Sequence, residues 1–79
     1  MTWHLTLYTR QDCGLCEEMK EVICEVGAEV PLEVEEVDVE GEIDLRERFS
    51  GEVPVLFIEG RKAFKYRVTA RELRKRLKH

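Results

Sequence analysis

The chain has 79 residues, of which 43% are hydrophobic and 38% charged, and its formal net charge is −4. A chain of this size and apolar content predicts one small folded domain over residues 1–79 rather than a disordered polypeptide. The acidic balance argues against a nucleic-acid binder, and the absence of any run of about 18 apolar residues argues against a membrane span.

Cysteine usage and the N-terminal segment indicate the compartment. The chain has three cysteines, whereas a secreted disulfide scaffold of this size usually carries an even number. The first residues do not combine a basic segment with an apolar one, so no signal peptide is visible. We therefore expect a cytoplasmic, monomeric protein whose cysteines are chemically reactive and do not form structural disulfides.

The first half of the chain predicts a strand, a helix and a second strand. Residues 3–8 are β-branched, aromatic and leucine residues, which favour a strand. Apolar residues then recur at helical spacing from Leu15 to Val26, and Gly27 is a plausible C-cap. Residues 32–39 alternate between apolar and acidic side chains, which predicts a half-buried strand. The alternation slips at residues 35–36, so we expect a bulge or an irregular start there.

The second half predicts a short helix, a hairpin and a final helix. The short helix spans residues 43–49, and the apolar run 53–58 is typical of a strand buried on both faces. Residues 59–60 form a tight turn before an edge strand over 61–66. The pair Thr69 and Glu72 is a capping-box pattern for the last helix, 69–77. The predicted order is β-α-β-α-β-β-α, with a parallel crossover first and an antiparallel hairpin near the end.

The stretch Cys13-Gly14-Leu15-Cys16 lies between the first strand and the first helix. Two cysteines at this spacing can meet across one helical turn, and their placement at a strand-to-helix junction indicates redox chemistry. The helix N-terminus has unpaired N–H groups and a dipole that favour the thiolate form of Cys13. Because the thiolate is the nucleophile, we expect Cys13 to attack and Cys16 to resolve.

The alternative for the cysteine pair is half of a zinc or iron–sulfur site. Such a site needs four ligands, and the remaining candidates are Cys24, His4 and His79. Cys24 is eight positions after Cys16, or about 12 Å along a helix, which is too far for a shared metal within one chain. The redox interpretation is favoured, while a non-enzymatic module that carries a cluster between two chains stays open.

The element order and three segments together resemble the thioredoxin fold in its smallest form, and glutaredoxins above all. The segments are Leu5-Thr6-Leu7-Tyr8-Thr9-Arg10, Cys13-Gly14-Leu15-Cys16 and Val53-Pro54-Val55-Leu56-Phe57-Ile58. The resemblance implies an α/β domain with a four-stranded mixed sheet and helices on both faces. It also implies a thiol–disulfide oxidoreductase that reduces or exchanges disulfides without a tightly bound cofactor or metal.

The resemblance further assigns site residues and partners. Cys13 and Cys16 match the attacking and resolving thiols, and Pro54 matches a proline that is cis in this family. Val53 matches the residue whose backbone pairs with an extended substrate. Arg10 matches a basic residue near the thiols. The substrate would be a protein or small-molecule disulfide, and the electron donor would be glutathione or a reductase.

The segment before the last helix departs from the glutaredoxin pattern. Glutaredoxins have a Gly-Gly pair followed by an acidic residue where glutathione is held, and this chain has Tyr66-Arg67-Val68-Thr69-Ala70 instead. The departure favours a protein electron donor over glutathione.

Overall fold

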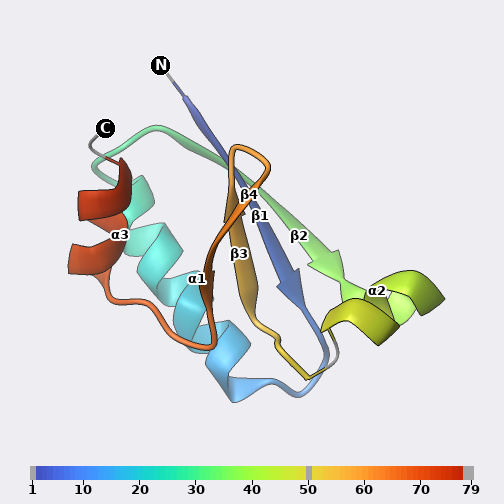
Figure 1. The fold of residues 1–79 in the computed structure, drawn as a ribbon. Coiled ribbons are helices and arrows are strands. Elements are labelled where there is room, and N and C mark those ends of the chain that lie inside the picture. The colour runs from blue at the N-terminus through green and yellow to red at the C-terminus, as the bar shows by residue number, and fades with distance from the viewer. Residues whose placement is uncertain (1, 50, 78–79) are drawn as a thin grey trace.

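Eight elements follow one another in the computed structural model, which describes residues 2–49 and 51–77 (Figure 1). They are β1 (Trp3–Thr9), α1 (Gly14–Gly27), β2 (Leu32–Asp38), the 3-10 helix η1 (Val39–Gly41), α2 (Ile43–Phe49), β3 (Val55–Ile58), β4 (Arg61–Lys65) and α3 (Ala70–Leu77). Apart from η1, this is the predicted order β-α-β-α-β-β-α. None of the described helices is both long and apolar enough to cross a membrane.

The four strands form one mixed sheet in the order β2-β1-β3-β4. Strands β1 and β2 are parallel, because α1 carries the chain back between them. Strand β3 runs antiparallel to both β1 and β4. The central strands β1 and β3 are therefore flanked on both sides, and β2 and β4 are the two edges.

Strand β3 contributes side chains to both faces of the sheet, as its apolar sequence predicts. Leu56 and Ile58 belong to a larger hydrophobic cluster, whereas Val55 belongs to a smaller one. Helices α1 and α3 supply the larger cluster, so they cover one face side by side (Figure 1). Helix α2 and η1 contribute Phe49 and Val39 to the smaller cluster, which lies on the opposite face. Helices thus cover both faces, as expected for a thioredoxin-like α/β fold.

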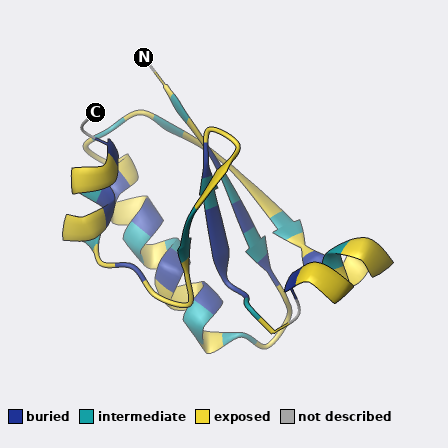
Figure 2. Cartoon of the chain, viewed as in Figure 1, coloured by how far each residue is buried: buried dark blue, intermediate teal, exposed yellow. Residues whose placement is uncertain are grey.

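The two clusters contain most of the buried side chains (Figure 2). The buried members of the larger cluster are Leu5, Leu7, Met19, Ile23, Val26, Leu56, Ile58, Val68, Leu73 and Leu77. The buried members of the smaller cluster are Cys16, Val39, Phe49, Val53 and Val55. The first turn of α1, which carries Cys16, therefore packs into the smaller cluster. The remainder of α1 packs into the larger one.

Two local signals in the sequence form as predicted. Thr69 and Glu72 make a reciprocal capping box: the Glu72 carboxylate accepts from the Thr69 N–H, and the Thr69 hydroxyl accepts from the Glu72 N–H, both at 3.0 Å. The turn between β3 and β4 has positive φ angles at Glu59 (51°) and Gly60 (81°). Positive φ at both central residues suits the twist of a two-residue hairpin.

The prediction of a C-cap at Gly27 was wrong. Gly27 is the last helical residue of α1, and Ala28 is the C-cap in right-handed α conformation. The Ala28 N–H donates to the carbonyls of Cys24 and Glu25, which closes the last turn without a left-handed residue.

The prediction of a bulge in the second strand was also wrong. Strand β2 pairs with β1 without a shift, with Thr6 opposite Glu35 and Leu7 opposite Glu36. As an edge strand, β2 is mostly exposed, so it does not need the strict alternation of a half-buried strand. It also ends at Asp38, one residue early, because the Asp38 carboxylate accepts from the Glu40 N–H at 2.9 Å and starts η1. The irregularity of the sheet lies instead in β4. Leu56 pairs with Phe64 and Phe57 pairs with Lys62, so one residue of β4 is left over between the two pairs.

Candidate active site

Cys13 occupies the N-cap position of α1. Its backbone is extended (φ −116°, ψ 103°), and its Sγ accepts a hydrogen bond from the Cys16 N–H at 3.2 Å. A Cys13–Cys16 disulfide closes the first turn, with the two Cα atoms 5.2 Å apart. The Cys13 sulfur therefore lies where the first-turn N–H groups and the helix dipole stabilise negative charge.

The two sulfur-bearing residues differ in burial. Cys16 is 1% exposed and belongs to the smaller cluster, whereas Cys13 is partly exposed and packs against that cluster. A substrate can therefore reach Cys13, whereas Cys16 is shielded from solvent and substrate. This asymmetry matches an outer attacking thiol and an inner resolving thiol.

The segment before β3 adjoins the cysteine pair. Val53 belongs to the same cluster as Cys16, and the Val53–Pro54 peptide bond is cis. Both residues are buried. The structure thus brings Cys13, Cys16 and the Val53–Pro54 peptide into one region, as the resemblance implied.

Arg10 lies apart from this cluster, in the loop that leads from β1 to Cys13. Its side chain is exposed and lines a polar hollow of about 330 Å³ beside Asp12 and Glu17. Lys20, on the next turn of α1, also lines the hollow, and its Nζ is 2.6 Å from a Glu36 carboxylate oxygen and 3.2 Å from one of Glu17. These carboxylates raise the pKa of Lys20. The hollow is a mixed-charge surface, and its lining residues Asp12 and Glu17 are the sequence neighbours of Cys13 and Cys16.

Sequence reasoning missed Tyr66, which holds the segment before β3 in place. The Tyr66 N–H donates to the Pro54 carbonyl at 2.8 Å, and its hydroxyl donates to the Gly51 carbonyl at 2.9 Å. Its φ is +67°, a left-handed backbone that is rare for a bulky residue. These two hydrogen bonds offset the cost of that backbone and fix both ends of residues 51–54. No local sequence pattern predicts a left-handed tyrosine.

Glu52 gives the same segment a third attachment. Its carboxylate is 3.1 Å from the Lys62 Nζ and 3.5 Å from the Lys65 Nζ, and both lysines belong to β4. The hydrogen bond and charge of Lys62 lower the pKa of Glu52. The segment that carries the cis peptide is therefore held at its two ends by hydrogen bonds from Tyr66, the residue after β4, and between them by ion pairs to β4 itself.

Cys24 and His4, the two further candidate metal ligands that the structure describes, do not gather around the cysteine pair. Within residues 2–49 and 51–77, no three His, Cys, Asp or Glu side chains form a cluster that could hold a metal ion. Cys24 is an exposed free thiol on α1. His4 lies on β1, where its Nδ1 is 2.9 Å from a Glu33 carboxylate oxygen. The remaining candidate, His79, lies outside the described residues.

Several solved structures are similar to this chain over most of its length. An X-ray structure of a structural-genomics target protein from X. campestris has 31% sequence identity and a TM-score of 0.80, with 92% of this chain and 93% of that chain covered. Reduced desulfothioredoxin from Desulfovibrio vulgaris Hildenborough has 26% identity and a TM-score of 0.71, with 95% and 78% covered. Oxidised mitochondrial thioredoxin 3 from Saccharomyces cerevisiae shares the fold, with 16% identity, a TM-score of 0.69, and 96% and 76% covered.

The family comparison covers almost the whole sequence. The model described as Glutaredoxin-like domain (DUF836) matches residues 4–78, which include the cysteine pair and the Val53–Pro54 peptide. The match spans all the elements that build the site, from β1 to α3. This chain therefore belongs to the glutaredoxin-like domain family.

Proposed function

We propose that the protein is a thiol–disulfide oxidoreductase that uses Cys13 and Cys16. The observation that carries the proposal is the partly exposed Cys13 sulfur at the N-terminus of α1, bonded to the buried Cys16. A reversible disulfide at a helix N-terminus is the working part of a redox protein. Family membership and the likeness to desulfothioredoxin support the same chemistry.

The reaction transfers two electrons from the dithiol to a substrate disulfide. The Cys13 thiolate attacks one substrate sulfur, which forms a mixed disulfide and releases the other sulfur as a thiolate. The Cys16 thiolate then attacks the Cys13 sulfur and releases the second substrate thiolate. The product is the Cys13–Cys16 disulfide, and two protons from the dithiol or solvent complete the substrate thiols.

The oxidised pair must be reduced before another turnover. A dithiol protein or two molecules of glutathione would supply the electrons and become oxidised in turn. The segment Tyr66-Arg67-Val68-Thr69 has no glycine pair to admit glutathione, and Tyr66 closes one end of it by hydrogen bonds. We favour a reductase-type protein donor for this reason.

The residues around Cys13 have supporting roles in this proposal. The backbone of Val53 pairs with an extended substrate segment, and Pro54 holds that backbone facing the sulfur. Arg10 is a candidate contact for the substrate on the side of the polar hollow, because it is exposed there.

Single cysteine variants test the proposal. Reduction of a disulfide substrate should be lost in Cys13→Ser, because the attacking sulfur is gone. Cys16→Ser should accumulate a mixed disulfide on Cys13, which intact-protein mass spectrometry detects. Cys24→Ser is the matched control, since this thiol is exposed and outside the pair, and it should retain the parental rate. Parental activity in Cys13→Ser would refute the proposal.

A further inference from the structure

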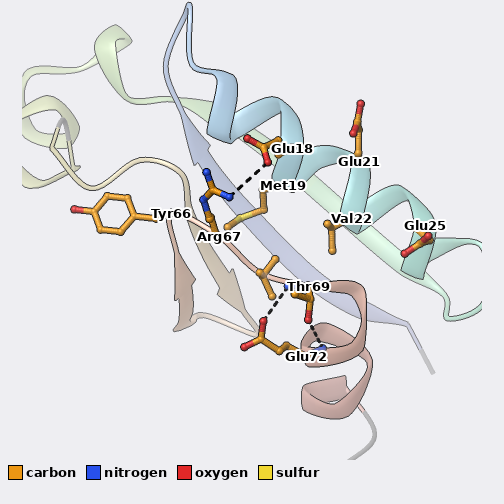
Figure 3. Close-up of a pocket in the computed structure, with 10 residues that line it drawn as sticks. Glu18, Met19, Glu21, Val22, Glu25, Tyr66, Arg67, Thr69 and Glu72 are labelled. Atoms are coloured by element: carbon orange, nitrogen blue, oxygen red, sulfur yellow. Dashed lines mark hydrogen bonds and ion pairs between the residues drawn. The ribbon is translucent and has the colours of Figure 1, made fainter.

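A groove of about 440 Å³ lies between α1 and the segment that leads into α3 (Figure 3). Its apolar side chains are Met19 and Val22 from α1 and Val68 from the facing segment. Met19 and Val68 are buried members of the larger cluster, so the floor of the groove is part of the core and is fixed in position. A rigid floor with an open top is suited to an extended segment of another chain.

The groove begins beside the proposed substrate-binding segment. Tyr66 lines the groove, and its N–H donates to the Pro54 carbonyl. On the α1 side the lining begins at Glu18, five positions after Cys13, or about 7.5 Å along the helix axis. A substrate chain attached to Cys13 through its own cysteine would enter the groove with its neighbouring residues.

The length of the groove matches a short peptide. Glu18, Glu21 and Glu25 line the groove from α1, and the first and last are about 10 Å apart along the helix axis. An extended chain covers this distance with about three residues. The volume and length together indicate a few residues of a peptide rather than a large cofactor.

The charge of the lining decides which peptide fits. Four glutamates line the groove, with Arg67 as the one cation among its lining residues. Glu18 and Arg67 are 4.0 Å apart and both exposed, and Glu25 is 4.0 Å from Arg74 outside the groove. Exposed ion pairs at this distance are weak, so the carboxylates keep most of their negative electrostatic potential in the groove. Glu21 has no ion pair within the described residues.

We propose that this groove binds a basic segment of the substrate protein, a few residues from the disulfide cysteine that Cys13 attacks. The inference deepens the proposed function, because it assigns the substrate class of the same site. The apolar floor contacts the stems of lysine or arginine side chains, and the carboxylates face their charged ends. An anionic thiol such as glutathione meets charge of its own sign here and is repelled, in agreement with a protein electron donor.

The test uses two disulfide-linked peptides that differ only in two residues a few positions from the cysteine, Lys-Lys in one and Glu-Glu in the other. We expect the parent protein to reduce the Lys-Lys peptide with a KM about three- to tenfold lower, which is the usual strength of a few exposed charge contacts. The double variant Glu18→Gln/Glu21→Gln should lose most of this preference. Because both peptides meet the same Cys13, any change in thiol reactivity cancels in the ratio.

A matched control and a salt series separate the groove from net charge. Glu35→Gln removes one negative charge from exposed β2, away from the groove, and should keep the preference. Raising the salt to about 0.5 M should shrink the preference, since the Debye length then falls well below 8 Å. Equal KM values for the two peptides with the parent, or an unchanged ratio in the double variant, would overturn the inference.

A binding measurement keeps the groove testable apart from the chemistry. Serine analogues of the two peptides cannot exchange disulfides, and their affinity for the oxidised protein can be measured by calorimetry. Tighter binding of the Lys-Lys serine analogue, weakened by Glu18→Gln/Glu21→Gln, supports the groove even if no peptide is reduced. Reduction of both cysteine peptides without any charge preference supports the proposed function and refutes the groove.

Discussion

The two hydrophobic clusters differ in chemistry and in origin. The buried members of the larger cluster are aliphatic residues and one methionine, and they come from elements near both ends of the chain, from Leu5 to Leu77. The smaller cluster contains Cys16 and Phe49 with three valines, and the partly buried Tyr8, Phe57 and Cys13 pack against it. The larger cluster packs the elements near both ends of the chain against the sheet, whereas the smaller cluster contains the redox pair or contacts it.

The stability of the fold and the geometry of the site therefore depend on separate parts of the molecule. Apart from Val68, the buried residues of the larger cluster belong to strands and helices that have regular hydrogen bonds of their own. The smaller cluster includes Val53, which lies outside regular structure, and Phe49, the last residue of a short helix. The positions of its residues depend on side-chain packing and on a few single hydrogen bonds. Substitutions in the two clusters should therefore have different consequences.

The largest expected effect comes from Leu56→Ala in the larger cluster. Leu56 is fully buried on β3, so the substitution leaves a cavity and should lower the free energy of unfolding by about 2–5 kcal/mol. The melting temperature should fall by roughly 4–8 °C for each kcal/mol. The redox equilibrium of the cysteine pair against dithiothreitol should stay at the parental value, because both redox states lose the same packing. A loss below about 1 kcal/mol would contradict the assignment of stability to this cluster.

Phe49→Leu tests the smaller cluster. The Phe49 ring stacks on Tyr8 with centroids 4.8 Å apart and meets Phe57 edge-on at 6.1 Å. Losing these aromatic contacts should cost about 0.5–1.5 kcal/mol of stability, less than Leu56→Ala. Phe49 shares its cluster with Cys16, so the dithiothreitol equilibrium should shift by about two- to fivefold. An unchanged equilibrium with the same loss of stability would mean that the two clusters do not differ in function.

Tyr66→Phe sharpens the comparison further, since it changes one hydrogen bond next to the smaller cluster. The ring and the backbone N–H to Pro54 remain, and only the hydroxyl contact with Gly51 is lost. We expect the free energy of unfolding to fall by at most about 1.5 kcal/mol, because the contact is exposed. The KM for a protein disulfide should rise while kcat stays constant, since the segment that we propose to pair with substrate is less firmly held. A lower kcat with an unchanged KM would place Tyr66 in the chemical step instead.

The sequence predicted the larger cluster better than the smaller one. Helical spacing identified the apolar side of α1, and the run 53–58 identified the strand buried on both faces. Both signals are periodic and local. The cysteine spacing and its strand-to-helix placement also located the redox pair correctly at the N-terminus of α1.

The elements that surround the pair could not be predicted in the same way. The left-handed backbone of Tyr66 depends on partners at Gly51 and Pro54, more than ten positions earlier in the chain. The expected bulge at residues 35–36 failed because the sequence does not state that β2 is an edge strand, where exposed acidic residues can follow one another. Contacts between distant segments and the position of a strand in its sheet are tertiary properties.

The smallest expected effect is an acid dependence from Glu52, on the exposed side of the segment that adjoins the smaller cluster. Lys62, by hydrogen bond and charge, lowers the pKa of Glu52 in the folded protein. A carboxyl whose folded pKa lies below its unfolded value stabilises the fold above the unfolded pKa, near 4.3, and loses this contribution as the pH falls through the folded pKa. The melting temperatures of the parent and Glu52→Gln should therefore differ slightly at pH 7 and converge as the pH falls toward 3. Salt at about 0.5 M should remove the difference at pH 7, because the pair is exposed and is screened. A difference that persists at pH 3 would show that Glu52 acts through packing and not through its charge.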